Sequence, residues 1–559
     1  MKMRSEKSSN KDGNMLLDLN ALSGADTKRL NGIADEIKAG YTAWIDSCCK
    51  KHADSPLLYA LPMVCRNTFL DDTFLSVCRM VLACEHLKRG DVYKVITVNE
   101  SERQVIAALA SPVVTVSSAE TEAHFAKSKN TVRRFLSTFR FIRQELAYMR
   151  LTGRNVQTFE QPVSMIFTPT ISSGFRGYEY NDRYFTGITE YKNDLVFLPT
   201  LNNNAGLSSR ELIDRMKNCS NYRFLLPFPF LRISDFGDIF RMWKLSDAMK
   251  KDPYVFAGID LAPVMCRALE RGKSNIAAQK AVLMRKIVQR MRKKVPLANA
   301  VVWYEGRPND IMTVAAIREN YQNVCSVGYQ GYPFPESNIG LCISEYQYTS
   351  GHAPDRLAIS SKLYEGLAHQ FCETIPLLYA PIMRSDYCVQ KPKLLTKPYK
   401  RILLLLSYFV ETSSVILRGI DHFIRTNPDE YEIMIKNHPT KDGYTVEDYG
   451  MGEPAFTPRY LSGRLTDCFE GVDVVVTSLT GSTLEVVFAG IPLIVLSPQG
   501  ELVFTALPKE TEKKFCHIAY DADELSVMLK KCMLEKPADP AVLTGMMVQK
   551  SKEAVAQLF

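Results

Sequence analysis

A turn of small polar residues late in the chain is the clearest place for chemistry. Asp473 to Ser497 reads DVVVTSLTGSTLEVVFAGIPLIVLS, which predicts a buried strand ending at Ser478 and a helix from Ser482 or Thr483 to Gly490. A helix that starts at the carboxyl end of a parallel sheet presents free backbone N–H groups, which bind phosphate. The candidates in this phosphate turn are Ser478, Thr480, Gly481, Ser482 and Thr483. The alternative is that Ser482 or Thr483 only caps the helix.

A histidine and a proline follow a second predicted strand. YEIMIKN runs directly into His438 and Pro439, one strand–helix unit before the phosphate turn. The proline ends the strand and stiffens the turn, so the imidazole projects from a fixed position at the same edge of the sheet. A histidine there can donate to a phosphate oxygen or, as the cation, stabilise a departing phosphate. The alternative is a purely structural histidine.

Together, the HP strand end and the Ser/Thr-rich strand–turn–helix resemble the carboxyl-terminal domain of GT-B glycosyltransferases that use CMP-activated acidic sugars. These are the bacterial sialyltransferases and capsule-type Kdo transferases. The resemblance covers residues 430–500 and, more loosely, 300–390, where WYEGRP, SVGYQG, APDRLAISSKLYEGL and APIMRS follow one another. It implies two Rossmann-like domains whose parallel sheets face an interdomain cleft. It also implies that the CMP phosphate is bound by His438, Pro439, Ser482 and Thr483.

Glu305 is the candidate catalytic base. The resembling families carry a D/E-D/E-G motif whose acid is the base, and the nearest match here is Tyr304-Glu305-Gly306, with tyrosine in place of the first acid. A carboxylate at the end of the predicted strand AVVWYEG, beside a glycine that permits close approach, can take a proton from an acceptor hydroxyl. The alternative is a structural ion pair with Arg307.

Other polar residues near predicted strand ends are secondary candidates. Asp71 and Asp72 follow the first predicted strand and rival Glu305 as acids, but they also fit the start of a helix. Gln330 precedes Gly331, where related transferases often carry histidine. The full set of secondary candidates is Arg66, Asn67, Asp72, Arg307, Gln330 and Ser407.

We expect transfer without a metal ion and without a cofactor other than the CMP-sugar donor. The eight histidines are scattered and form no HExxH or His/Cys ligand spacing. The DxD-like Asp521-Ala522-Asp523 lies beside a predicted terminal helix rather than at a strand end. Because CMP leaves with a single phosphate, a helix amino terminus and a histidine can offset its charge.

The elements that position these residues follow an alternating pattern. Apolar segments of strand length alternate with longer amphipathic segments, which predicts an α/β fold of parallel sheets covered by helices. The predicted strands of the first block are 57–64, 92–98, 113–117, 164–170, 194–201, 222–228, 300–306 and 324–330, and its helices include 21–53, 127–151 and 260–294. After a linker, VQKPKLLTKPYK, the alternation restarts with strands at RILLLLSY, YEIMIKN, DVVVTS and PLIVLS.

These elements predict four regions. Residues 1–20 form a disordered tail, and 21–390 an acceptor-binding Rossmann-like domain with helical insertions. Residues 398–520 form a nucleotide-sugar-binding Rossmann-like domain, and 521–559 supply helices that pack back across the cleft.

Composition limits the class of protein. With 46% hydrophobic residues the chain is neither disordered nor fibrous, and 559 residues allow two to four domains of roughly 100 to 200 residues. A net charge of +8 suits anionic ligands but is small for a dedicated nucleic-acid binder. Fourteen cysteines without a CxxC pair, a polar amino terminus and short apolar runs indicate a reducing cytoplasm and no membrane-spanning segment.

Two basic amphipathic stretches stand out. The first interleaves Arg133, Arg134, Arg140 and Arg143 with Phe135, Phe139 and Phe141, and the second holds Arg285, Lys286, Arg290, Arg292, Lys293 and Lys294. Such surfaces can rest on an anionic inner membrane leaflet or hold a lipid-linked, negatively charged glycan. The commoner alternative is a solvated face of an ordinary helix.

These observations predict a cytoplasmic glycosyltransferase, with contact to the inner-membrane surface as a further expectation. It would transfer Kdo or a nonulosonic (sialic) acid from CMP to a surface polysaccharide or lipopolysaccharide-type acceptor. Two alternatives stay open. One is a UDP-sugar-dependent GT-B glycosyltransferase or epimerase, and the other is a non-catalytic polysaccharide-assembly scaffold, in which Tyr304 marks the loss of the base.

Overall fold

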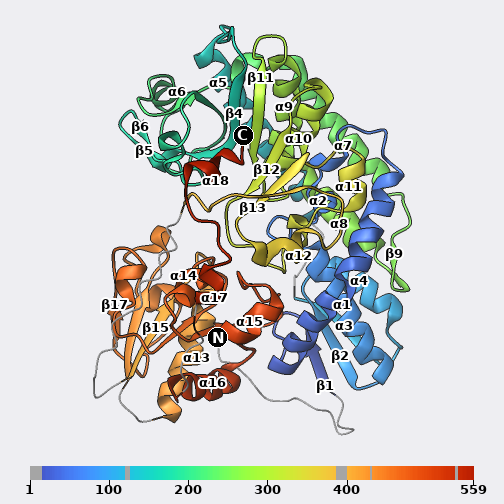
Figure 1. The fold of residues 1–559 in the computed structure, drawn as a ribbon. Coiled ribbons are helices and arrows are strands. Elements are labelled where there is room, and N and C mark those ends of the chain that lie inside the picture. The colour runs from blue at the N-terminus through green and yellow to red at the C-terminus, as the bar shows by residue number, and fades with distance from the viewer. Residues whose placement is uncertain (1–14, 120–125, 385–399, 428–430, 535–538, 540) are drawn as a thin grey trace.

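Two large parallel sheets organise the chain (Figure 1). The computed structural model describes residues 15–119, 126–384, 400–427, 431–534, 539 and 541–559. Both faces of each sheet are buried, because alternate residues of one strand belong to different hydrophobic clusters. In the second sheet, Ile402 and Leu404 pack on one face, whereas Leu403 and Leu405 pack on the other. Burial on both faces is why this strand reads as an unbroken apolar run.

The first large sheet has seven strands in the order β14-β13-β12-β11-β4-β7-β8, all parallel to their neighbours. They are β4 (Val163–Ile171), β7 (Leu195–Asn202), β8 (Arg223–Phe224), β11 (Leu297–Trp303), β12 (Ser326–Gln330), β13 (Arg356–Ile359) and β14 (Leu377–Tyr379). β4 comes first in the chain, and later strands are added on one side of it and then on the other. The direction switches between β4 and β11, and open α/β sheets bind ligands at the carboxyl ends of strands beside such a switch.

The second large sheet repeats this topology with six parallel strands, in the order β17-β16-β15-β18-β19-β20. They are β15 (Lys400–Leu405), β16 (Tyr431–Lys436), β17 (Pro458–Tyr460), β18 (Val474–Thr477), β19 (Leu493–Leu496) and β20 (Cys516–Ala519). Here the direction switches between β15 and β18, which places the phosphate turn at the switch. The predicted fold class, α/β and GT-B-like with two Rossmann-like sheets, is confirmed.

A third, smaller parallel sheet precedes the other two. It contains β1 (Met15–Asp18), β2 (Val92–Thr97) and β3 (Thr115–Ser118), in that order. We call residues 15–118 the three-stranded unit. The prediction of a disordered tail over residues 1–20 is therefore wrong from Met15 onward, and residues 1–14 lie outside the described residues. β1 pairs with a strand more than 70 residues away, so its local sequence gives no sign of it.

The first predicted strand is also wrong. Residues 57–64 form a 3₁₀ turn at Leu58–Ala60 and the short helix α2 (Pro62–Cys65). A short buried apolar run has no periodicity that separates a strand from a helix, and Pro62 at the first helical position favours the helix. The predicted strand 222–228 shrinks to β8, and the predicted helix 260–294 divides at Asn275, whose side chain caps its second half. The predicted linker at 388–399 lies outside the described residues.

Helices cover the sheets and connect their strands (Figure 1). Those up to β14 are α1 (Gly24–Lys50), α2, α3 (Thr73–Arg89), α4 (Glu100–Leu109), α5 (Ala126–Thr152), α6 (Ser209–Lys217), α7 (Gly237–Met249), α8 (Ala262–Lys273), α9 (Ile276–Met291), α10 (Pro308–Asn320), α11 (Glu345–Thr349) and α12 (Glu365–Ala368). Those after it are α13 (Val410–Thr426), α14 (Thr483–Phe488), α15 (Lys509–Phe515), α16 (Ala522–Leu534), α17 (Ala541–Thr544) and α18 (Lys552–Ala556). Among the described helices, none has the length and apolar character needed to cross a bilayer.

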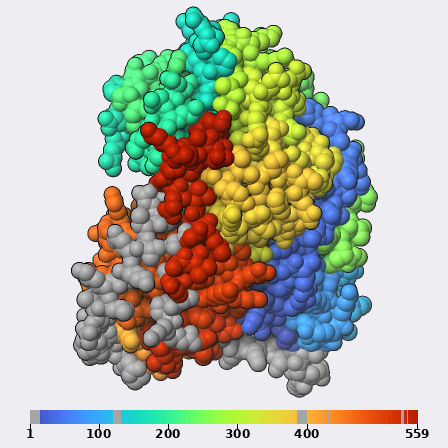
Figure 2. All heavy atoms as spheres, viewed as in Figure 1, coloured from blue at the N-terminus to red at the C-terminus, as the bar shows by residue number. Residues whose placement is uncertain are grey.

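The carboxyl-terminal segment joins the two large domains. α16 packs on α13 of the six-stranded domain, and α17 packs on α14. The chain then crosses to the seven-stranded domain, where Met547 bridges to Ser361 and the side chains of Val555 and Leu558 enter the core beside Trp303 and Tyr329. Figure 2 shows this segment running over the surface from one domain to the other.

Candidate functional site

A cavity of about 220 Å³ lies between the two large domains. The seven-stranded domain and the α2–α3 loop contribute most of its wall, and the six-stranded domain contributes the opposite side. Its lining residues are Asn67, Phe69, Glu305, Arg307, Tyr332, Pro333, Pro335, Asn338, Leu341, Arg384, Gly481 and Phe504. The interdomain cavity therefore brings together Glu305, at the switch point of the first sheet, and Gly481, at the switch point of the second.

Glu305 follows β11 and is held by two side chains. Its Oε1 accepts a hydrogen bond from Trp303 Nε1 at 2.8 Å, and its Oε2 pairs with the Arg307 guanidinium. The ion pair that formed the alternative interpretation is thus present. However, the Glu305 side chain keeps 17% of its surface exposed and lines the interdomain cavity, so it is accessible to a small substrate.

Two glycines allow three loops to meet behind Glu305. Gly306 has a φ of +65°, and a Cβ added there would overlap the carbonyl oxygen of Gly340. A Cβ on Gly340 would lie 2.7 Å from the backbone of Asn67. Asn67 Nδ2 in turn donates to the Glu305 carbonyl oxygen at 2.7 Å. The close approach of these backbones fixes the position of the Glu305 turn.

Gly306→Ala is expected to lower the free energy of unfolding by about 3 kcal/mol. The added methyl group must displace the Gly340 backbone, and the alanine residue must adopt a left-handed backbone conformation. Gly351→Ala is the matched control, since Gly351 has a φ of +81° and nothing within 4 Å of an added Cβ. The control should lose only about 1 kcal/mol. Urea unfolding measures both variants, and equal losses would contradict the close packing of this turn.

A buried carboxyl group supports the same turn. Asp310, in the first turn of α10, accepts the backbone N–H of Glu305 at 2.9 Å and that of Arg307 at 3.2 Å, both on Oδ2. Burial raises the pKa of Asp310 to about 7, with Arg307 opposing the rise and Glu305 adding to it. Its protonation state therefore changes near neutral pH, directly behind the candidate base.

Asp310→Asn should remove a pH-dependent part of the stability. The folded pKa of about 7 lies above the ordinary value of 3.8, so Asp310 stabilises the fold below pH 3.8 and loses that contribution as the pH rises through 7. The stability of the wild type relative to the variant should therefore fall by about 2.5 kcal/mol between pH 5 and pH 8. Denaturant unfolding at both pH values measures this, and a pH-independent difference would contradict it.

His438 lies at the carboxyl edge of the second sheet. Its Nδ1 accepts the backbone N–H of Thr440 at 3.2 Å, which leaves Nε2 to carry the proton of the neutral ring. Burial lowers the pKa of His438, and the charges of Arg183 and Lys441 lower it further. The imidazole is thus a neutral Nε2–H donor at pH 7. Pro439 is exposed and begins the 3₁₀ turn Pro439–Lys441.

The phosphate turn lies at the same edge. β16 and β18 both flank β15, so the ends that carry His438 and Ser478 are about 10 Å apart by strand spacing. α14 starts at Thr483, and the Ser482 side chain does not cap it; instead, Thr480 Oγ1 accepts the Ser482 N–H at 3.2 Å. Within the described residues, the buried hydroxyls of Ser478 and Thr483 have no partner. Because such hydroxyls are costly, their presence favours a binding role for the turn.

Two arginines of the seven-stranded domain face this edge. Arg384 lines the interdomain cavity, with its Nη2 3.7 Å from the position of a Cβ on Gly481, and its charge also acts on Glu485 of α14. Arg183 is close enough to His438 for its charge to lower the pKa of the imidazole. Sequence reasoning missed both arginines. Arg384 closes the segment APIMR after β14, and a basic residue at a strand end is the signal that could have found it.

Aromatic side chains beside His438 were also missed. Tyr408 and Phe409 follow β15 at the switch point and are 55% and 48% exposed. The Tyr408 ring contacts the His438 ring edge-on, with centroids 5.7 Å apart, and Lys441 Nζ lies 5.8 Å from the Tyr408 centroid. Exposed aromatic rings at this position provide an apolar platform for the base or the sugar of a nucleotide.

The remaining predicted site residues do not line the interdomain cavity, and neither do His438, Pro439, Ser478, Thr480, Ser482 and Thr483. Arg66 is buried and binds Asp46 and Gln347, each at 3.0 Å. Asp71 accepts the Thr73 N–H at 3.0 Å at the start of α3, and Asp72 pairs with Arg267 and Arg271. Gln330 is buried and donates to the Leu341 carbonyl oxygen, and the Ser407 hydroxyl donates to the Phe409 carbonyl oxygen. These side chains shape loops around the site, because each is already bonded within the protein.

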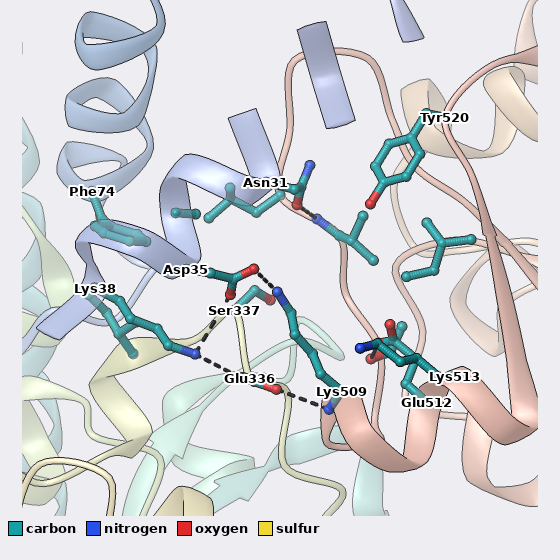
Figure 3. Close-up of a pocket in the computed structure, with 16 residues that line it drawn as sticks. Asn31, Asp35, Lys38, Phe74, Glu336, Ser337, Lys509, Glu512, Lys513 and Tyr520 are labelled. Atoms are coloured by element: carbon teal, nitrogen blue, oxygen red, sulfur yellow. Dashed lines mark hydrogen bonds and ion pairs between the residues drawn. The ribbon is translucent and has the colours of Figure 1, made fainter. Parts of the chain in front are cut away.

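A second cavity, of about 210 Å³, lies where α1, residues 336–339 and residues 502–520 meet (Figure 3). Lys38 pairs with Glu336 at 2.6 Å, and Lys509 pairs with Asp35. Thr505 donates to Glu512. These charged side chains already pair with one another across the contact between the three-stranded unit and the large domains. The interdomain cavity is therefore the better candidate for a ligand site than this second cavity.

Several of the remaining charged candidates have structural partners. In the second basic stretch, Arg285 pairs with Glu319 at 2.7 Å, Lys286 with Asp238 at 3.0 Å, and Arg290 with Asp235. Asp521 accepts the Glu524 N–H at 2.8 Å at the start of α16. Among the described residues, no group of three or more His, Cys, Asp or Glu side chains is placed to hold a metal ion.

Comparisons with known proteins find solved structures with a distantly similar fold. No protein family model matches the chain, and no curated protein matches it. The lipopolysaccharide outer core galactosyltransferase WaaB is 10% identical over 71% of this chain and 94% of its own, with a TM-score of 0.36. A UDP-N-acetylglucosamine 2-epimerase from Listeria monocytogenes, described as putative, is 10% identical over 71% and 94%, with a TM-score of 0.39. The glycosyltransferase SnogD from Streptomyces nogalater is 13% identical over 69% and 99%, with a TM-score of 0.32.

Proposed function

We propose that the protein is a glycosyltransferase that uses a CMP-activated acidic sugar, either Kdo or a nonulosonic acid. The observation that supports this best is the interdomain cavity, where a carboxylate from one Rossmann-like sheet faces the phosphate turn of the other. The acceptor in this proposal is a surface polysaccharide or a lipopolysaccharide-type glycan.

The phosphate of the donor binds at the edge of the second sheet. His438 donates from Nε2, and the first-turn amides of α14 have no partner within the helix. Arg384 and Arg183 add positive charge from the opposite domain. Guanidinium groups pair well with carboxylate and phosphate, so this lining suits a donor that carries both groups. An acidic sugar supplies the carboxylate that a neutral hexose lacks.

Transfer then follows from the two sides of the cavity. Glu305 takes the proton of an acceptor hydroxyl, the acceptor oxygen forms a bond to the anomeric carbon, and the bond from that carbon to the CMP phosphate breaks. The charge that develops on the leaving phosphate is stabilised by the His438 Nε2–H and by the arginines. In this proposal Arg307, which pairs with Glu305, holds the carboxylate in position.

The nucleotide can be tested directly with purified protein. CMP, CMP-Kdo and CMP-sialate should raise the melting temperature, since a ligand at 100 times its Kd stabilises the fold by about 2.7 kcal/mol. UDP, UDP-N-acetylglucosamine and GDP-mannose should have little effect. Stabilisation by UDP compounds alone would reject the CMP proposal in favour of a UDP-sugar transferase or epimerase. No response to any nucleotide would favour the polysaccharide-assembly scaffold.

A further inference from the structure

The first half of α5 carries an exposed apolar stripe. Val132, Phe135, Leu136 and Phe139 are 57%, 41%, 52% and 57% exposed. Their spacing of three, four and seven residues places them on one face of the helix. Scattered exposed apolar residues are ordinary, whereas a contiguous row of large ones marks an interaction surface.

The stripe lies in a segment of the sequence that is rich in basic residues. Within residues 126–152 the basic residues are Lys127, Lys129, Arg133, Arg134, Arg140, Arg143 and Arg150, and the single acidic residue is Glu145. Arg134 pairs with Glu270 at 2.7 Å. Arg133, Arg140 and Arg143 are exposed and form no ion pair with a described carboxylate. Their charge is therefore available to an outside partner.

An open hollow adjoins the stripe. It has a volume of about 440 Å³ and is lined by Arg133, Arg134, Ser137, Arg140 and Ser274. Three guanidinium groups and two hydroxyls around one concavity suit a phosphate group, because guanidinium groups form forked hydrogen bonds to its oxygens. The apolar stripe therefore suits the acyl region of a lipid, and the hollow beside it suits a phosphate group.

The second basic stretch, on α9, provides a contrast within the same chain. Its Arg285, Lys286 and Arg290 pair with Glu319, Asp238 and Asp235. These three basic residues of α9 are thus neutralised, whereas Arg133, Arg140 and Arg143 of α5 are not. Arg292, Lys293 and Lys294, which follow α9, are exposed and form no ion pair with a described carboxylate.

We propose that the α5 face, made of Val132, Phe135, Leu136 and Phe139 with Arg133, Arg140 and Arg143, docks on an anionic lipid bilayer. Amphipathic helices bind the membrane interface by inserting an apolar face while basic residues contact anionic headgroups. A second copy of the chain fits less well, because a two-fold contact would bring the unpaired arginines of both copies together. In Figure 1, α5 lies at the end of the molecule opposite the six-stranded domain, so docking there leaves the phosphate turn uncovered.

Vesicle flotation tests this docking with the full-length protein. Binding to vesicles of phosphatidylcholine with 30% phosphatidylglycerol is expected, and binding to pure phosphatidylcholine should be at least about tenfold weaker. The double variant Arg133→Gln/Arg140→Gln should weaken partition into the anionic vesicles by on the order of tenfold or more. Leu136→Ser/Phe139→Ser should weaken it at both low and high salt, because it removes the apolar contribution.

Matched surface variants serve as controls. Arg464→Gln removes an exposed charge from the six-stranded domain, and Val527→Ser removes a side chain that is 68% exposed on α16. Both should float like the wild type, and circular dichroism should show that every variant is folded. The proposal is overturned if the wild type ignores anionic vesicles, if the α5 variants float equally well, or if the α5 variants abolish only a concentration-dependent dimer. None of these outcomes depends on the donor nucleotide.

Discussion

Glu305→Gln is expected to lower kcat by about 10²- to 10⁴-fold, the usual contribution of a general base. The KM for the donor should change little, because glutamine keeps the size of the side chain and can still accept the Trp303 Nε1–H. The loss should appear in the chemical step, where the acceptor hydroxyl must give up its proton. Steady-state transfer assays with the donor that stabilises the protein measure both constants.

Asp72→Asn is the matched control for this carboxylate. Asp72 is the rival acid, but it pairs with Arg267 and Arg271 and does not line the interdomain cavity. Its loss should leave kcat within about twofold, since it removes only a surface ion-pair network. If Glu305→Gln keeps wild-type kcat, or if Asp72→Asn shows the large loss, the assignment of the base is wrong.

His438→Ala is expected to reduce kcat by about 10²- to 10³-fold, the typical effect of removing one hydrogen-bond donor from developing charge. His438→Gln should recover part of the rate, because a glutamine amide can donate from nearly the same position as Nε2. Affinity for CMP should fall in the alanine variant as well. Isothermal titration with CMP and steady-state transfer assays measure the two effects separately.

His422→Ala controls for loss of an imidazole elsewhere in the same domain. His422 lies on α13, is 45% exposed and contacts only the exposed Asp523 among described carboxylates. It should bind CMP and turn over like the wild type. Equal behaviour of the two alanine variants would remove His438 from the phosphate site.

The replacement of the first acid by Tyr304 has a structural explanation. Tyr304 is fully buried, and its hydroxyl accepts a hydrogen bond from Gln347 Nε2 at 2.9 Å. An ionised acid at this position would be costly, because the side chain points into the core rather than into the cavity. The tyrosine therefore does not by itself indicate a lost base, which weakens the scaffold alternative.

The sequence predicted the parts of the site that depend on local order along the chain. The ends of β16 and β18 carry His438 and the phosphate turn, and parallel strands of one sheet bring such ends to the same edge. The end of β11, in the other sheet, carries Glu305. The sequence did not predict Arg384 and Arg183, because their approach to the second sheet depends on how the domains pack. β1 was missed for the same reason, since its pairing partner Val92–Thr97 lies far along the chain.

Some secondary candidates do not line the interdomain cavity because each forms hydrogen bonds or ion pairs that the sequence could not predict. Arg66 looked available after a predicted strand, yet it binds Asp46 from α1 and Gln347 from α11. Ser407 ends an apolar run, which is a typical position for a site residue, but its hydroxyl forms hydrogen bonds with the backbone of Phe409 in the same turn. Hydrogen-bond partners distant in sequence decide whether such a side chain is free to meet a ligand.

A crystal structure with CMP tests the central claim most directly. We predict that the phosphate lies between His438 Nε2 and the amides of the phosphate turn, within hydrogen-bonding distance of both, with the nucleoside beside Tyr408. A phosphate bound at the junction of α1 and α15, or one that contacts neither His438 nor residues 480–483, would contradict the proposed site.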